Sequence, residues 1–475
     1  MDINKYFGGK RTAQPEAFFL TRRQFLNRFG MGFGALSLAS LLGPEMFSNS
    51  TAHAADLSLL APKEPHFPAR AKRVIHIFAQ GAPSHVDTWD PKPMLTQMAG
   101  KPLPGSGGVA MASPFSFEKH GQAGIEVSEV FPNIGKHVDE LAIIRSMHTN
   151  IPAHEPATVM MNTSSLRLST PSLGSWVLYG LGSENQNMPG YISLRPGNMP
   201  PGGSQNWQSA FLPGVFQGTS VNTQFTSVEQ LIENIINPYT PLGEQRRQLD
   251  LVHKLNEVHS QNLQKDARLE ARLEAFEMAF KMQTEASDAF DLSKETAATK
   301  NLYGNGPQGR QLLLARRLLE RGVRFVQVWA GGWDHHQDLE GRLRQRAKEI
   351  DQPAAALLTD LKNRGMLDDT LVIWGGEFGR KPTQDKNGNA NPGRDHNNRA
   401  FSTWLAGGGV KGGTIYGATD EFGAASVENK VHVNDLHATI LKLLGFDHEK
   451  LTYRYNGRDF RLTDVAGKVV TGVLA

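Results

Sequence analysis

Amphipathic helical segments alternate with short, uninterrupted apolar strands along this chain of 475 residues. Residues 311–321 carry leucines at helical spacing and run through Gly322 into the apolar segment 323–329. The same pattern predicts a helix at 354–361 and strands at 74–79, 141–144, 370–374 and 401–406. Strands that are apolar throughout are buried on both faces. The alternation therefore predicts an α/β fold, a mainly parallel sheet sandwiched between helices.

Two stretches interrupt this alternation. Residues 189–221 are rich in Gly, Pro, Asn, Gln and Ser, and predict a long irregular loop of the kind that often forms a binding surface. Residues 242–284 are charged, with apolar residues at heptad-like spacing. We expect a helical insertion at about 226–300, an amphipathic helix or helical hairpin packed on a single domain that spans 55–475.

The N-terminus has the pattern of a twin-arginine signal peptide. Arg22 and Arg23 precede Phe25, a modest apolar stretch covers 29–42, and small residues around His53 form a candidate cleavage site. The pattern predicts that residues 1–54 are removed during export by the twin-arginine translocase. The mature protein would then be periplasmic or extracellular. No later run of 18 apolar residues occurs, so no transmembrane segment is expected in it.

Charge and cysteine content exclude several functions. The formal net charge is +3, and residues 1–54 contribute six Lys/Arg against three Asp/Glu, so the remainder is neutral. A neutral chain offers no electrostatic reason to expect a nucleic-acid partner. There is no cysteine, which excludes disulfides and thiolate ligands. A transition metal would have to be held by His, Asp and Glu.

Candidate ligands cluster at the ends of the predicted strands, where α/β sheets bind their ligands. Asp334 and His336 follow the strand 323–329, and Glu377 follows 370–374. Imidazole and carboxylate together suit a divalent metal. The other candidates near strand ends are His85, Asp87, His154, Arg380, Arg394 and His396. The arginines are candidates for holding an anion by paired hydrogen bonds.

The order of these pieces resembles the alkaline phosphatase and sulfatase superfamily, and more closely the exported domain-of-unknown-function family 1501. The resemblance covers about 72–469. It rests on Gly81–Pro93, Ala153–Pro156, Phe211–Gly214, Gly332–His336, Gly376–Arg380, Gly393–Asn397 and Val433–Gly445.

The resemblance implies that Asp334 and His336 form a metal-binding pair, with Glu377 and His396 as further ligands. It also places His154 at the position of the family's nucleophile, as nucleophile or as another ligand. Gln80 stands where the first strand normally supplies a metal-binding Asp, so Asp87 or His85 would have to substitute.

These observations predict an exported, metal-dependent hydrolase of phosphate or sulfate esters that acts on a small-molecule or glycan substrate. Zinc is the expected cofactor, with manganese, iron or calcium as alternatives. Arg380 or Arg394 would hold the anion, and Gln205, Asn206 and Trp207 are a candidate substrate lip. One alternative is a non-catalytic protein on the same scaffold that binds an anionic ligand or glycan. Another is a metal enzyme of different chemistry, such as a lyase.

Overall fold

The computed structural model describes residues 59–475 except 106, 167–169, 186, 233–236, 238, 263–266 and 386–390. The predicted signal peptide lies outside the described residues. The chain divides into two units. One includes the helix α7 (Leu242–Asn262), and the other comprises Leu57–Ile236 and Ala267–Ala475. The sheet, its two cores and the sites described below belong to the second unit.

A nine-stranded sheet forms the centre of this unit, in the order β12-β4-β11-β8-β1-β7-β5-β6, with β15 paired to β4. Its strands are β1 (Arg73–Phe78), β4 (Leu141–His148), β5 (Tyr191–Arg195), β6 (Thr219–Asn222), β7 (Phe325–Trp329), β8 (Thr370–Gly375), β11 (Phe401–Ala406), β12 (Thr414–Tyr416) and β15 (Val431–His432). Every pairing is parallel except those of β11 with β8 and β4. The predicted α/β class with a mainly parallel sheet is confirmed.

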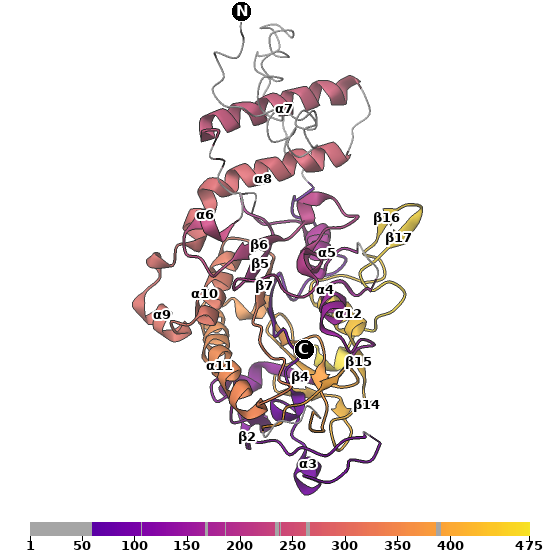
Figure 1. Cartoon of the computed structure of the whole chain (residues 1–475). Helices are drawn as coiled ribbons and strands as arrows, with labels where there is room; N and C mark the ends of the chain where they lie inside the picture. Colours follow the sequence, from indigo (N-terminus) through magenta and orange to yellow (C-terminus); the bar gives the residue numbers. More distant parts are fainter. Residues whose placement is uncertain are drawn as a thin grey trace, which may run out of the picture. The chain divides into compact units, whose positions relative to one another are not determined.

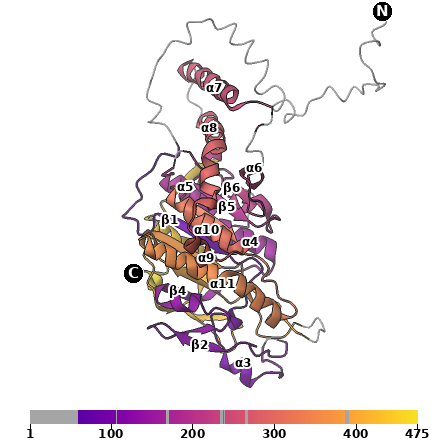
Figure 2. The ribbon, with the colours of Figure 1, turned by 90° about the vertical axis from the view of Figure 1, so that its left-hand side faces the viewer.

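Helices cover both faces of the sheet (Figures 1 and 2). Ile75 and Ile77 of β1 belong to a core shared with α10 (Pro307–Glu320) and α11 (Leu339–Asn363). Val74 and Phe78, the alternate residues of the same strand, belong to a second core. That core is shared with α4 (His154–Thr163), α5 (Leu173–Leu181) and α12 (Val433–Leu443). Both faces of β1 are therefore buried, which explains why Val74, Ile75, Ile77 and Phe78 are all apolar.

The segment predicted as an irregular loop, 189–221, contains more regular structure than its composition indicates. It begins with β5 and ends in β6, which pair in parallel and form one margin of the sheet. Between them lie two short 3-10 helices, Gly203–Trp207 and Gly214–Phe216. The predicted helical insertion contains α6 (Val228–Leu231), α7 and α8 (Ala267–Phe290).

The direction of β11 decides which loops meet. The chain leaves β1, β4, β7 and β8 at one edge of the sheet because these strands run in the same direction. Since β11 runs in the opposite direction, its first residue, Phe401, lies at that edge. A segment that precedes β11 therefore meets the segments that follow the other four strands.

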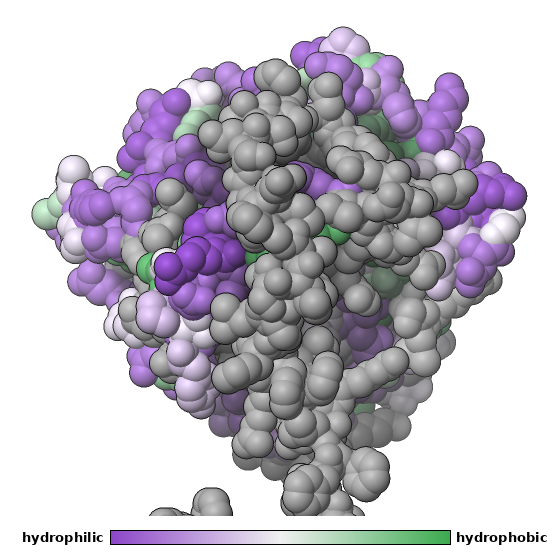
Figure 3. All heavy atoms as spheres, turned by 90° about the horizontal axis from the view of Figure 1, so that it is seen from above, coloured by the Kyte–Doolittle hydropathy of each residue, from purple (hydrophilic) through white to green (hydrophobic). Residues whose placement is uncertain are grey.

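The described part of the surface visible in Figure 3 is mainly hydrophilic, with apolar residues scattered across it. Among the described helices, none combines the length and the apolar character needed to cross a bilayer.

Gly81 brings the loop after β1 against the loop after β7. Its φ is +109°, a conformation that side chains rarely adopt. A Cβ at this position would lie 2.7 Å from the backbone N of Asp334 and 2.8 Å from that of Trp333. The backbone of residues 333 and 334 leaves no room for a side chain at this position, so the close approach of the loop that carries Asp334 depends on this glycine.

We predict that Gly81→Ala lowers the free energy of unfolding by more than the cost of placing an alanine in a left-handed conformation. Gly100 is the matched control, because its φ is +76° and a Cβ there would meet nothing within 4 Å. Gly100→Ala should lower the free energy of unfolding by about 1–2 kcal/mol, the strain of a left-handed residue. Gly81→Ala should lower it by clearly more, as measured by urea denaturation. Equal losses would show that the close approach is unimportant.

Candidate metal centre

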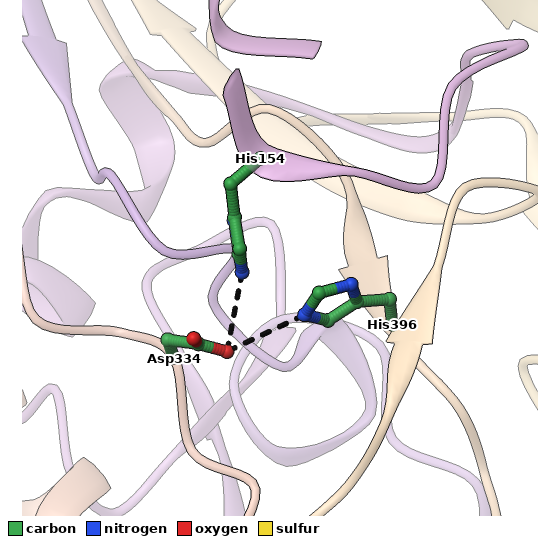
Figure 4. Close-up of side chains that lie close together, drawn as sticks. All are labelled: His154, Asp334 and His396. Atoms are coloured by element: carbon green, nitrogen blue, oxygen red, sulfur yellow. Dashed lines mark ion pairs between the residues drawn. The ribbon is translucent and has the colours of Figure 1, made fainter. Parts of the chain in front are cut away.

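His154 is the first residue of α4 and lies between two carboxylates. Its Nδ1 is 2.6 Å from Oε1 of Glu377, and its Nε2 is 3.2 Å from Oδ1 of Asp334. Glu377 follows β8, and Asp334 follows β7. Figure 4 shows His154 and His396 both pointing toward the carboxylate of Asp334. Loops from three different strands thus meet at one point.

His336 and His396 approach the same oxygen. Nε2 of His336 lies 3.0 Å from Oδ1 of Asp334, and Nε2 of His396 lies 3.5 Å from it. The other ring nitrogen of each histidine contacts a hydrogen-bond acceptor. Nδ1 of His336 is 2.5 Å from Oδ2 of Asp385, and Nδ1 of His396 is 2.9 Å from the carbonyl oxygen of Pro152.

These contacts assign Nδ1 of each ring as a hydrogen-bond donor. A carboxylate or a carbonyl oxygen only accepts, so each Nδ1 must donate its hydrogen. In the neutral form of each ring Nε2 carries a lone pair, and all three Nε2 atoms converge on Asp334. Nε2 of His336 and Nε2 of His396 are only 3.0 Å apart, and Nε2 of His154 is buried. Three lone pairs beside a carboxylate form a site for a cation.

The histidine arrangement matches what metal sites in proteins require. A histidine ligand nearly always donates its second ring N–H to a carboxylate or a carbonyl oxygen, which fixes its tautomer and orientation. His154, Asp334 and His396 have their ligand atoms within 4.8 Å of one another, and so do His336, Asp395 and His396. The residues present therefore fit a divalent cation.

Arg380 is buried beside this cluster. Its Nη2 donates to Oδ1 of Asp334 at 2.6 Å, its Nε to the carbonyl oxygen of Ala82 at 2.9 Å and its Nη1 to that of Arg394 at 3.1 Å. Nη2 also donates to the carbonyl oxygen of Gly81. The predicted anion-holding side chain is therefore bonded to the protein on all three nitrogens, and it positions the carboxylate of Asp334.

The neighbouring charges shift both pKa values at the centre. Burial acts to raise the pKa of Asp334, but hydrogen bonds from His154 and His396 and the charge of Arg380 hold it well below its usual range. For His154, burial acts to lower the pKa, and hydrogen bonds to Asp334 and Glu377 outweigh it and raise the pKa to about 9. In the metal-free protein His154 is therefore protonated at neutral pH, and a metal must displace that proton.

Glu377, predicted as a metal ligand, is completely buried. Its Oε1 and Oε2 accept from the backbone N–H of Gly81 at 2.9 and 3.2 Å, and Oε1 also contacts Nδ1 of His154. The structure thus places this carboxylate behind His154, on the side opposite Asp334. From there it orients the imidazole.

Asp87, Arg394 and His85 are not brought to the cluster. Asp87 and Arg394 form a completely buried ion pair, with Nε–Oδ2 at 2.6 Å and Nη2–Oδ1 at 2.9 Å. Arg394 also donates to the carbonyl oxygens of Met111 and Lys381. His85 is buried, and its Nε2 lies 2.8 Å from the carbonyl oxygen of Gly423. These residues secure the loops around the centre.

The predicted substrate lip is mostly interior. Asn206 is completely buried and accepts from Nδ2 of Asn162 at 3.0 Å. Trp207 is buried, with its ring 6.4 Å from that of Trp329. Gln205 is half-buried. Asn206 and Trp207 therefore join the segment between β5 and β6 to the domain.

Sequence reasoning missed Asp385, which holds Nδ1 of His336, and the carbonyl oxygen of Pro152, which holds Nδ1 of His396. It also missed Asp395 of the second group. The position of Asp395, directly before His396, was an available signal. No spacing pattern points to Asp385, which lies 49 residues from its partner.

Residues 71–474 match the family model described as "Protein of unknown function (DUF1501)". The chain belongs to this family. No curated protein matches it.

Several solved structures are similar to this DUF1501 member. The lipoteichoic acid synthase LtaP from Listeria monocytogenes is 11% identical, with 87% of this chain and 80% of that chain covered and a TM-score of 0.37. The PsFucS1 sulfatase from Pseudoalteromonas sp. is 12% identical, with 80% and 69% covered and a TM-score of 0.35. The alkaline phosphatase from the Antarctic bacterium TAB5 is 10% identical, with 80% and 99% covered and a TM-score of 0.36.

We predict that His154 of the metal-free protein titrates near pH 9 in a histidine-detected NMR titration, with its signal assigned by its loss in His154→Gln. Glu377→Gln should move the midpoint down toward the ordinary value of 6.5 by removing one carboxylate partner. Because the folded-state pKa is raised, the stabilisation from the protonated ring is present below about pH 6.5. It is lost as the pH rises through about 9. A wild-type midpoint near 6.5 would contradict this assignment.

Proposed function

We propose that this chain is an exported, metal-dependent hydrolase of phosphate or sulfate esters. One observation carries the proposal. The Nε2 atoms of His154, His336 and His396 converge on Asp334, while each Nδ1 is held by an acceptor. These ligand atoms suit a cation. They lie at the carboxyl edge of the sheet, where α/β proteins bind their substrates. The motifs shared with the phosphatase and sulfatase superfamily support the ester class.

Three imidazoles and one carboxylate suit zinc best, and manganese or iron next. Calcium prefers six to eight oxygen ligands, and the converging atoms here are mostly nitrogen. We therefore propose zinc as the resident cofactor. Its ligands would be His154, His336, His396 and Asp334.

A bound divalent ion would polarise the ester oxygen and lower the pKa of a coordinated water. Other residues of the chain orient the ligands for this chemistry. Glu377, Asp385 and the carbonyl oxygen of Pro152 hold the three rings, and Arg380 holds Asp334. The side chain of Asp334 is 45% exposed, so substrate and water can reach the centre from its side.

His154 has the role of a ligand in this proposal and not that of a covalent nucleophile. Its Nδ1 donates to Glu377, and its Nε2 faces Asp334. A nucleophilic imidazole needs one nitrogen free to approach the substrate. Because both nitrogens of His154 face protein carboxylates, we propose that water attacks the ester.

We predict that the wild-type protein, purified from its exported form, contains about one equivalent of zinc, manganese or iron by elemental analysis. His396→Gln and Asp334→Asn should lose the metal, because each removes a converging atom. Glu377→Gln should retain the site but weaken metal affinity about 10–100-fold, as expected for a residue that orients a ligand. His137→Gln is the matched control, since this half-buried histidine also lies beside a glutamate, with Nδ1 3.6 Å from Glu140.

The rate of hydrolysis of p-nitrophenyl phosphate or p-nitrophenyl sulfate should fall with the metal content of these variants. EDTA should abolish it, and added zinc should restore it. A folded wild-type protein that neither contains nor takes up metal contradicts the proposal. Metal binding without turnover of any phosphate or sulfate ester would favour the alternative, a protein that binds an anionic ligand or glycan without hydrolysing it.

A further inference from the structure

Ser164 and His437 form a hydrogen-bonded pair that the metal centre does not use. Ser164 ends α4, and its Oγ contacts Nδ1 of His437 in α12. Nε2 of His437 lies 2.9 Å from the carbonyl oxygen of Met161. A carbonyl oxygen only accepts, so Nε2 donates, and Nδ1 presents its lone pair to the serine hydroxyl. A serine, a histidine base and a group that orients the base are the parts of an activated nucleophile.

Ser164 borders a cavity of about 310 Å³, within the range of small-molecule sites. Much of the lining is apolar. The apolar residues that line it are Ile151, Met160, Leu166, Val465 and Ala466. Leu166 is 59% exposed and Val465 is 84% exposed, so the cavity opens to solvent beside them. The space suits a short apolar group that enters from the surface.

Two residues that line the same cavity each carry a polar atom without a partner. Oγ1 of Thr149 is buried and lacks a hydrogen-bond partner, and only 3% of this residue is exposed. Nε2 of His432 is also buried without a partner. Nδ1 of His432 accepts from the backbone N–H of Asn434 at 3.3 Å, so its hydrogen is on Nε2. Donors that lack a partner are available to a developing oxyanion.

The backbone of Ser164 has a conformation that side chains rarely adopt. Its φ is +56°, the left-handed conformation in which glycine is favoured at the end of a helix. Residues held in such conformations concentrate at functional sites. Glycine at this position would end α4 equally well without the strain. The hydroxyl therefore has a use beyond ending the helix.

We propose that Ser164 and His437 are the nucleophile and the general base of a second, metal-independent site that hydrolyses carboxylic esters of short acyl groups. Oγ of Ser164 bonds to the acyl carbon as its proton passes to Nδ1 of His437. The bond from that carbon to the alcohol oxygen breaks, and the alcohol leaves with the proton. A water molecule then gives a proton to Nδ1 and attacks the acyl-serine. The carboxylic acid is released, and Ser164 recovers the proton.

The environment of His437 is consistent with this role. Burial, together with the nearby His432, lowers the pKa of His437 to about 4, although its contact with Met161 acts to raise it. The ring is therefore neutral near pH 7, and its lone pair is available to the serine. The neutral donors Thr149 and His432 would hold the carbonyl oxygen of the ester.

The test uses the purified full chain treated with EDTA. A fluorophosphonate probe should label it, and mass spectrometry of the digested protein should place the label on Ser164. The treated protein should also hydrolyse p-nitrophenyl acetate above the background rate. Ser164→Gly should lose both the labelling and the hydrolysis and should still fold, because relief of the backbone strain offsets part of the lost hydrogen bond to His437.

His437→Gln should reduce the labelling rate at least 100-fold, since it removes the base. The control is Ser146→Ala, a buried serine outside the cavity whose hydroxyl donates to the carbonyl oxygen of Asn429. It should label like the wild type. Absence of labelling in the folded wild-type protein, a label on another residue, or full labelling of Ser164→Gly would overturn the proposal. If His437→Gln misfolds, Ser164→Gly still tests the proposal, because that variant should fold.

Discussion

A single antiparallel strand brings the candidate metal ligands together. The segments after β4, β7 and β8 reach one edge of the sheet because these strands are parallel. His396 precedes β11, and it joins them only because β11 runs the other way. If β11 were parallel, the chain would enter it from the opposite edge, about 20 Å away for a strand of six residues. The convergence on Asp334 depends on this reversal.

Buried charges hold the converging loops in place. The ion pair of Asp87 with Arg394 joins the loop after β1 to the segment before β11, with both side chains fully buried. Breaking such a pair leaves an uncompensated buried charge, which costs about 3–5 kcal/mol. Arg380 also connects the loops, because it donates to Gly81, Ala82 and Asp334. Arg380 and Arg394, which the sequence suggests as anion-binding residues, therefore stabilise the loops around the centre.

The two proposed sites use histidine in opposite ways. At the metal centre the carboxylates of Asp334 and Glu377 raise the pKa of His154, so a cation must displace a proton. At Ser164 the base is His437, which burial keeps neutral and which contacts a carbonyl oxygen and a hydroxyl. α4 links them, since His154 begins this helix and Ser164 follows its last residue.

The α/β class and the placement of candidate ligands were predictable from the sequence. Continuous apolar strands require helices on both faces, and Asp334, Glu377 and His396 stand next to such strands in the chain. The partner of each side chain was not predictable. Glu377 lies 223 residues from His154, and Asp87 lies 307 residues from Arg394, so no local spacing encodes either contact. Only the folded sheet decided that Glu377 orients a histidine, because hydrogen-bond partners are chosen by proximity in space.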